Sequence, residues 1–130
     1  MALVLGSGVF FCPALEASPV KVRQAEGVVH GFLVLRTLDG KDLADGELLQ
    51  VARGERVTSH LVFHFKDGSR HDETVVYSQR YRFRLLTYHL VQKGPSFPQP
   101  VDVKIDAVKG RVTGRYREKG GGEELIDESL

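Results

Sequence analysis

Residues 56–78 read RVTSHLVFHFKDGSRHDETVVYS, and this stretch decides the fold class. Within residues 57–65 the odd positions are mostly apolar, whereas the even positions carry a threonine, two histidines and a valine. A two-residue period is typical of a β-strand with one face toward a core and the other toward water. Asp67 and Gly68 then form a turn signal, because glycine adopts the positive φ of a tight reversal at low steric cost. The stretch therefore predicts a β-hairpin.

From residue 28 onward the chain repeats this pattern of short β-branched and aromatic runs separated by turns that contain glycine. Strands are expected over residues 28–37, 47–52, 56–65, 71–78, 81–92, 101–106, 111–118 and 123–130. Turn signals stand at Asp39-Gly40, Asp45-Gly46, Arg53-Gly54, Asp67-Gly68, Lys109-Gly110 and residues 120–122. The pattern predicts an all-β fold, an antiparallel meander that forms a strongly curved sheet or partial barrel. One short helix over residues 45–53 is the alternative for the second strand, since Asp45 could cap it and Gly54 could end it.

Composition sets limits on the function. The chain has 130 residues, fewer than the roughly 150 usually allotted to one domain, so we expect one folding unit. Lys and Arg together number 18 and Asp and Glu 17, and these totals exclude a strongly basic nucleic-acid binder. The sequence has no Gly-x-Ser-x-Gly elbow, and its one cysteine is Cys12. We therefore expect neither an enzyme nor a bound cofactor.

The N-terminus is mostly apolar. Residues 2–15 read ALVLGSGVFFCPAL, and the run ends just before the small residues Ala17 and Ser18. Such a run is typical of a secretory signal peptide, and it is shorter than the about 17 to 25 residues of a membrane-spanning helix. We expect a signal peptide over residues 1–17, a β domain over residues 18–130 without a membrane span, and a periplasmic or secreted protein. A buried N-terminal strand is the alternative interpretation of the run.

Residues around the predicted hairpin form a candidate metal site. If Asp67 and Gly68 close a two-residue turn, His64 lies opposite His71, and Glu73 lies diagonal to His64. A three-residue turn with a glycine bulge shifts the register by one residue and places the two histidines on opposite faces. The alternative to a metal site is a set of exposed polar residues on a wetted sheet face.

Arginines form a second candidate site, for a ligand or partner. Arg80, Arg82 and Arg84 alternate with apolar residues and would share one face of the expected strand. A cationic stripe of this kind fits an anionic surface such as lipid headgroups or an envelope polysaccharide. Pairing with carboxylates on a neighbouring strand is the alternative.

The longest break between expected strands is residues 94–100, GPSFPQP. Its three prolines exclude regular ladder pairing and favour an extended, stiff loop. Phe97, in the middle of this loop, is a candidate ligand-binding residue at the lip of a cavity. The alternative is that Phe97 packs onto the core beneath a plain crossover.

The chain resembles an uncharacterised group of secreted bacterial β-proteins in three segments, GFLVLRTLDGKDLADGELLQVARG, HLVFHFKDGSRHDETVVYSQR and VQKGPSFPQPVDVKID. Members of that group are longer, so the resemblance implies that further strands follow residue 130. The strand pattern is also similar to that of the periplasmic lipoprotein-carrier half-barrels, which cradle acyl chains on a curved antiparallel sheet. This second likeness implies a lipid or another apolar small molecule as ligand.

Export and the alternating faces together favour a non-enzymatic extracytoplasmic protein that holds a lipid or another apolar ligand on a concave sheet. The alternative is an envelope interaction or structural module that binds a protein or an anionic glycan through its arginine-rich strand faces. The concave face distinguishes the two hypotheses. A wide, apolar face favours a carrier, whereas a closed and packed one favours a module.

Overall fold

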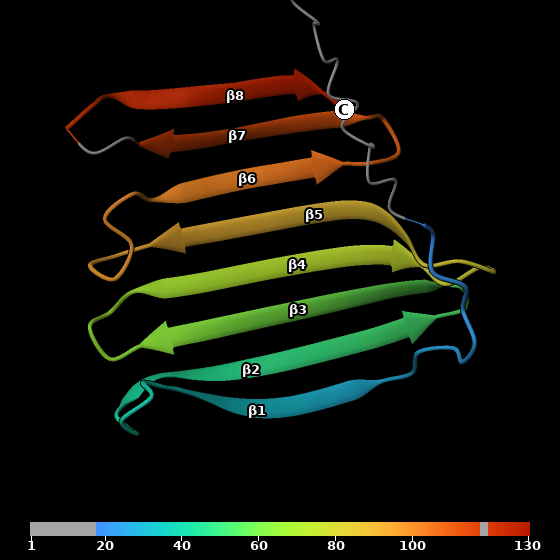
Figure 1. Ribbon diagram of the computed structural model, residues 1–130, viewed down its shortest axis with the longest axis horizontal. Helices are drawn as coiled ribbons and strands as arrows, with labels where there is room; N and C mark the ends of the chain where they lie inside the picture. The colour runs from blue at the N-terminus through green and yellow to red at the C-terminus, as the bar shows by residue number, and fades with distance from the viewer. Residues whose placement is uncertain (1–17, 118–119) are drawn as a thin grey trace, which may run out of the picture.

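The computed structural model describes residues 18–117 and 120–130, which form one antiparallel sheet (Figure 1). Its eight strands follow one another across the sheet in chain order. They are β1 (Val29–Arg36), β2 (Asp42–Arg53), β3 (Arg56–Phe65), β4 (Arg70–Ser78), β5 (Arg84–Lys93), β6 (Val101–Asp106), β7 (Arg111–Arg117) and β8 (Glu123–Ser129). The predicted all-β antiparallel meander is confirmed. The predicted signal peptide, with Cys12, lies outside the described residues.

The alternative helix over residues 45–53 is wrong. These residues belong to β2, which pairs along its length with β1 on one side and β3 on the other. A nine-residue helix has little stability without tertiary contacts, whereas a central strand satisfies its backbone groups on both sides. Pairing with two neighbouring strands therefore outweighs the local sequence signals for a helix in this segment.

The turn predicted at Asp45-Gly46 is also wrong, because both residues lie inside β2. A Cβ atom added at Gly46 would lie 2.5 Å from two ring carbons of Phe63, its cross-strand partner. Gly46 thus allows the aromatic ring to lie against the backbone of β2. The other predicted turns are confirmed by glycines of positive φ, which are Gly40, Gly54, Gly68, Gly110 and Gly120.

Strand β5 begins three residues later than predicted. Tyr81 has a φ of 62°, an uncommon value for a residue other than glycine, and it breaks the ladder before the strand starts. The residues around it pair with the N-terminal segment instead. The Val22 amide donates to the Tyr81 carbonyl over 2.9 Å, and the Phe83 amide donates to the Val20 carbonyl over 3.1 Å.

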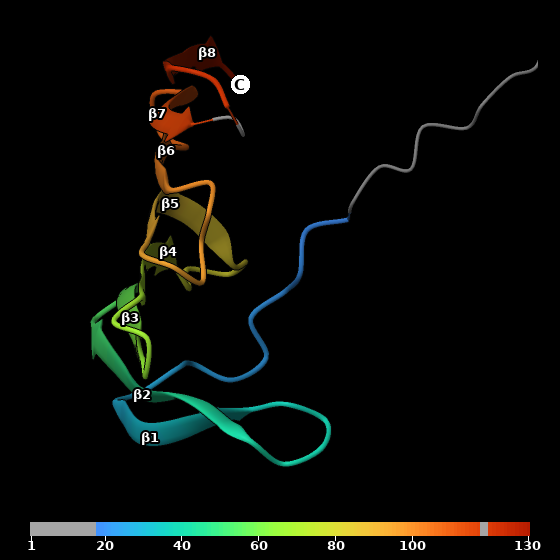
Figure 2. The ribbon, with the colours of Figure 1, turned by 90° about the vertical axis from the view of Figure 1, so that its left-hand side faces the viewer.

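The sheet is a single curved layer, with the N-terminal segment on its concave side (Figure 2). Its register is irregular between Leu35 and Arg36 and between Val76 and Tyr77, and such bulges bend a strand and increase its twist. The sheet does not close, since β1 and β8 each pair with one neighbour only. It is an open curved sheet, consistent with a partial barrel.

Cross-strand pairs share a face, so the register assigns each side chain to the concave or the convex side. Gln50 marks the concave side, because its Nε2 donates to Glu26 Oε2 of the N-terminal segment over 3.2 Å. The centre of the concave face consists of Leu48, Leu61, Phe63, Val75, Tyr88, Leu90, Val103 and Ile105. All of these are only half-buried. Among the described residues, the buried hydrophobic side chains are Ala44, Val57, Val62 and Val76.

An apolar sheet face ordinarily packs against a second layer. Here no described residue forms such a layer over the middle of the concave face, as the side view shows (Figure 2). In the described part of the chain the concave face is therefore wide and mainly apolar.

Candidate functional site on the concave face

The N-terminal segment, residues 20–28, bounds the concave face at one end of the strands. It crosses from the start of β5 to the start of β1 (Figure 1). The Glu26 amide donates to Gln79 Oε1 over 2.5 Å, and Gln79 Nε2 donates back to the Glu26 carbonyl over 3.2 Å. Gln79 is 8% exposed, so this reciprocal pair fixes the segment to the sheet through a buried side chain.

A hollow of about 440 Å³ opens beside this segment. It is lined by Glu26, Val75, Tyr77, Phe83, Arg84 and Leu85. Tyr77 and Phe83 stack edge-on with their ring centroids 5.9 Å apart. Burial and the nearby Glu26 carboxylate raise the pKa of Tyr77, so its hydroxyl remains protonated and can donate to Gln50 Oε1. The hollow is thus mainly apolar and aromatic, and two charged residues, Glu26 and Arg84, also contribute to its lining.

The proline-rich loop, residues 94–100, bounds the opposite end. Phe97 packs edge-on against Phe65, the last residue of β3. The loop is held by Ser96, whose amide donates to Ser69 Oγ over 2.7 Å and whose hydroxyl donates to Asp67 Oδ2 over 2.5 Å. The Ser96 hydrogen bond, together with the Ser69 amide, lowers the pKa of Asp67. The loop and the β3–β4 turn therefore form one unit at this end.

Phe97 is half-buried and contacts an aromatic ring on the concave face. It therefore packs against the sheet, as expected in the alternative in which the loop is a plain crossover. This contact also places it at the boundary of the concave face, where a lip residue would lie.

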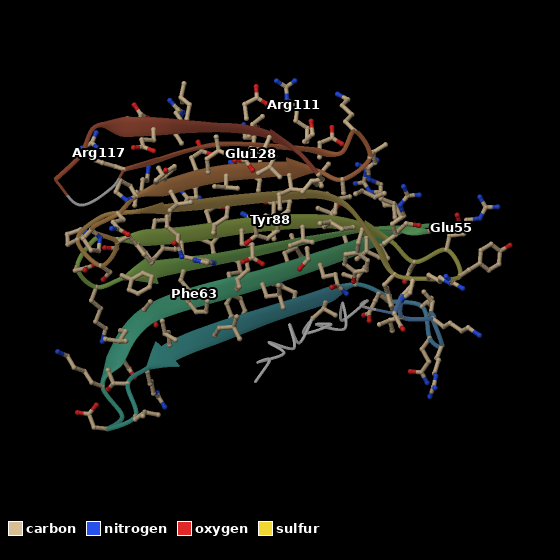
Figure 3. The ribbon with its side chains drawn as sticks, turned by 45° about the horizontal axis from the view of Figure 1, so that its top comes forward. Glu55, Phe63, Tyr88, Arg111, Arg117 and Glu128 are labelled. Carbon is tan, nitrogen blue, oxygen red and sulfur yellow. The ribbon has the colours of Figure 1, made fainter. Side chains whose placement is uncertain are left out.

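Polar side chains interrupt the apolar surface between the two ends. Gln92 Nε2 donates to His71 Nδ1 over 3.0 Å. His71 Nε2 lies 3.6 Å from Glu73 Oε2, and the Tyr88 hydroxyl donates to the same oxygen over 3.3 Å. We call these four residues, from adjacent strands β4 and β5, the polar cluster. Tyr88 is labelled over the middle of the sheet in Figure 3.

Charge is divided between the two faces. Apart from the bulged pair Arg36–Asp42, every lysine and arginine of the strands lies on the convex side by alternation; these are Arg53, Arg56, Arg70, Arg84, Lys93, Lys104, Arg111, Arg115 and Arg117. The concave side carries the strand carboxylates Glu73, Glu124 and Glu128. The concave face is therefore apolar and acidic.

Charged side chains on the convex face form pairs. Those between neighbouring strands are His30–Glu47, His60–Asp72, His89–Asp102, Arg115–Asp102, Arg115–Glu123 and Arg111–Asp127, and Arg70–Asp72 is a pair within β4. The His89 hydrogen bond lowers the pKa of Asp102 despite partial burial. Burial alone would raise the pKa of Asp72, but the contacts with His60 and Arg70 outweigh this effect, so the pKa is lowered overall.

The predicted metal residues are not brought together. The β3–β4 turn has three residues, with Gly68 at positive φ, and the Phe65 amide donates to the Ser69 carbonyl. His71 therefore pairs with Phe63, and His64 pairs with Arg70 on the opposite face, so the two-residue register is wrong. Glu73 lies with His71 on the concave side. Within the described ranges, no group of three or more His, Cys, Asp or Glu residues is placed to hold a metal ion.

The predicted arginine stripe is also divided. Arg80 and Arg82 precede β5, and only Arg84 belongs to it, so the three do not share one strand face. Arg80 contacts Glu55 and lies over the Tyr81 ring, at 5.6 Å from its centroid. By contrast, Arg111, Arg115 and Arg117 share the convex face of β7, with Arg111 and Arg117 at its two ends (Figure 3).

Sequence reasoning did not single out Tyr88, Gln92 or Glu26. A signal for the first two was present, because alternation in β5 places Tyr88, Leu90 and Gln92 on one face. Their meeting with Glu73 and His71 depends on the register of β4 against β5, which a bulge shifts. Glu26 belongs to a segment without any strand pattern, and no sequence signal indicates its position.

The chain matches no model of a known protein family, no curated protein and no solved structure. Its resemblance to secreted bacterial β-proteins therefore stays a prediction. In the part of the chain that the structure describes, no helix has the length and apolar content needed to cross a bilayer. The function has to be argued from the concave face itself.

Proposed function

We propose that the protein is a non-enzymatic extracytoplasmic binding protein that holds an apolar ligand, such as a lipid or acyl chain, on its concave face. The observation that carries this proposal is the row of half-buried apolar side chains across β2 to β6, including Leu61, Leu90 and Val103. Covering apolar surface stabilises a complex by roughly 25 cal/mol per Å² of area removed from water. A ligand that lies along this face would supply the missing layer.

The ends of the face support a ligand of limited length. The N-terminal segment lies at the Tyr77 end and the Phe97 loop at the Phe65 end. The six residue-to-residue steps of β4 from His71 to Tyr77 span about 20 Å at about 3.3 Å per step. An extended acyl chain therefore fits along the strands between the two bounding segments.

The alternative, an envelope module that binds an anionic partner through its arginines, receives less support. Arg111 contacts Asp127, and Arg115 contacts carboxylates on both neighbouring strands. An anionic partner would have to compete with these internal pairs. By contrast, no described residue packs over the middle of the concave face, so an apolar ligand would displace no internal contact there.

Binding of a neutral fluorescent probe, N-phenyl-1-naphthylamine, tests the proposal. We expect enhanced fluorescence that saturates with protein concentration, and loss of at least tenfold in affinity for Leu90→Lys. Val91→Lys is the matched control, because Val91 is the next residue of β5 and is also half-buried but faces the convex side. Equal effects of the two substitutions would contradict binding on the concave face.

A second measurement addresses the natural ligand. Protein purified from its native host is extracted with organic solvent, and the extract is analysed by mass spectrometry. A lipid at near one equivalent is expected. Repeatedly empty extracts, together with a failure to bind the probe, would exclude the proposed function.

A further inference from the structure

The polar cluster is a set of mutually contacting polar side chains surrounded by apolar residues of the concave face. Glu73 lies between Leu61 and Leu90, its cross-strand neighbours on the concave face. Its side chain is 28% exposed, and that of His71 is 19% exposed. A carboxylate in such surroundings loses hydration, and this loss has to be offset by hydrogen bonds or by a ligand.

The hydrogen-bond directions in the cluster follow from its chemistry. The Gln92 amide nitrogen donates to His71 Nδ1, and the other ring nitrogen, His71 Nε2, lies 3.6 Å from Glu73 Oε2. The Tyr88 hydroxyl donates to the same oxygen. Burial and the Glu73 carboxylate raise the pKa of Tyr88, which keeps its hydroxyl a donor.

These contacts orient Glu73 and leave one of its oxygens available. Both neighbouring groups approach Oε2, whereas Oε1 receives no hydrogen bond from any described residue. No lysine or arginine of the described strands β3 to β6 lies on the concave side beside Glu73, since those residues lie on the other side. The site therefore presents one oriented carboxylate oxygen, Oε1, without a lysine or arginine partner from the described strands.

We propose that the polar cluster binds the ammonium head of a single-chain cationic amphiphile. The head donates to Glu73 Oε1, and the alkyl chain lies along β4 past Val75 toward the hollow beside Tyr77. This inference rests on the proposed function, because the chain requires the apolar concave face. It goes further in naming the polar end of the ligand and its charge.

Charge complementarity selects this ligand over the alternatives. A fatty acid would bring a second carboxylate close to Glu73, and like charges at short range in a partly desolvated site repel strongly. A neutral alcohol could donate one hydrogen bond but would lack the ion pair. The ammonium adds a Coulomb attraction to Glu73 that the alcohol cannot supply, and this attraction is stronger in a partly desolvated site than in bulk water.

The test is displacement of N-phenyl-1-naphthylamine by three ligands of equal chain length, which are dodecylammonium, dodecanol and dodecanoate, all used below their micellar concentrations. For the unaltered protein we expect dodecylammonium to bind at least tenfold tighter than dodecanol, and dodecanoate to bind most weakly. In Glu73→Gln the preference for dodecylammonium over dodecanol should fall to less than threefold. The affinity of each variant for the neutral probe is measured directly, and the displacement constants are calculated with that variant's own value.

Glu124→Gln is the matched control, because it makes the same chemical change on the concave side of β8, away from the cluster. It should keep the tenfold preference. Loss of the preference in Glu124→Gln as well would overturn the inference, because the effect would then belong to the charge of the whole face. Circular dichroism of each variant establishes that the sheet is intact.

The outcomes separate the two proposals. If the probe binds and the three ligands displace it equally, or if Glu73→Gln keeps the preference, the headgroup inference is overturned while the apolar site stands. If neither the probe nor dodecylammonium binds, as measured by fluorescence and by calorimetry, both proposals fail.

Discussion

Phe97 lies edge-on against Phe65, with the ring centroids 5.3 Å apart and the ring planes at 83°. This contact joins the proline-rich loop to the last residue of β3, 32 positions earlier in the chain. Edge-to-face aromatic pairs contribute about 0.5–1.5 kcal/mol beyond the area that they bury. The contact therefore helps to position the loop at the end of the concave face.

Replacing Phe97 tests this role. Phe97→Ala should lower the free energy of unfolding by about 1–2 kcal/mol, because a half-buried ring and its aromatic partner are lost. Urea denaturation measures the change. Phe97→Leu, which keeps most of the apolar area, should recover at least half of the loss, and an unaltered midpoint for Phe97→Ala would show that the loop does not depend on this ring.

Two glycines of positive φ are expected to differ in their tolerance of alanine. Gly94 has a φ of 106°, and a Cβ there would lie 2.6 Å from the Ser69 Cα atom; Gly40 has a φ of 89° and open space around it. Gly40→Ala should cost only the left-handed backbone penalty, about 1–2 kcal/mol. Gly94→Ala adds a clash with backbone and should cost about 3 kcal/mol or more. Thermal unfolding of both variants compares them, and equal losses would refute the close approach of Ser69.

The close approach of the Phe63 ring to Gly46 predicts that alanine at position 46 destabilises the sheet and that a smaller side chain at position 63 restores part of the loss. Gly46→Ala should destabilise the sheet by about 1–3 kcal/mol, since the new methyl group would displace the ring. Gly31→Ala is the control, because nothing lies within 4 Å of its added Cβ. The double variant Gly46→Ala with Phe63→Leu should be more stable than the two separate losses would suggest, as a double-mutant cycle measures. Simple additivity would count against the contact.

The free energy of unfolding should decrease in acid, because carboxylates on the convex face become protonated. The pKa values of Asp72 and Asp102 are lowered in the folded protein, so in that range the unfolded chain binds more protons. Their contribution is therefore fully present above the ordinary aspartate pKa of about 3.9 and is lost as the pH falls through the lowered folded values. In Asp102→Asn the slope of unfolding free energy against pH should be shallower between about pH 4 and pH 2. Urea denaturation at several pH values measures it, and an unchanged slope would contradict the pKa shift.

Much of the fold could be predicted from the sequence. The glycine turns and the alternation in β3 identify the strands, because a two-residue period with turn residues between the runs has few other solutions. The turn predicted from Asp45-Gly46 was wrong, because glycine at position 46 allows the close approach of the Phe63 ring and does not mark a chain reversal. The local rules also failed at Tyr81, where pairing with residues 20–22 ends the strand pattern.

The candidate site was less accessible to sequence reasoning, because it depends on register. One residue in the β3–β4 turn decides whether His71 faces His64 or the Phe63 ring. The bulge between β4 and β5 likewise decides which β5 residues meet Glu73. Such single-residue shifts leave little trace in composition or periodicity.

The separation of charge between the two faces gives the sheet an electric dipole moment along its normal. Among the described strand residues outside the Arg36–Asp42 pair, the cations of the convex side outnumber its carboxylates, whereas the charged residues of the concave side are the carboxylates Glu73, Glu124 and Glu128. Fixed charges of this kind exert a torque in the field of another charged body, and the torque acts within about 10 Å at physiological salt. Close to an anionic surface the molecule would turn its convex side inward, and the mouth of the apolar face would then point to the surrounding solution.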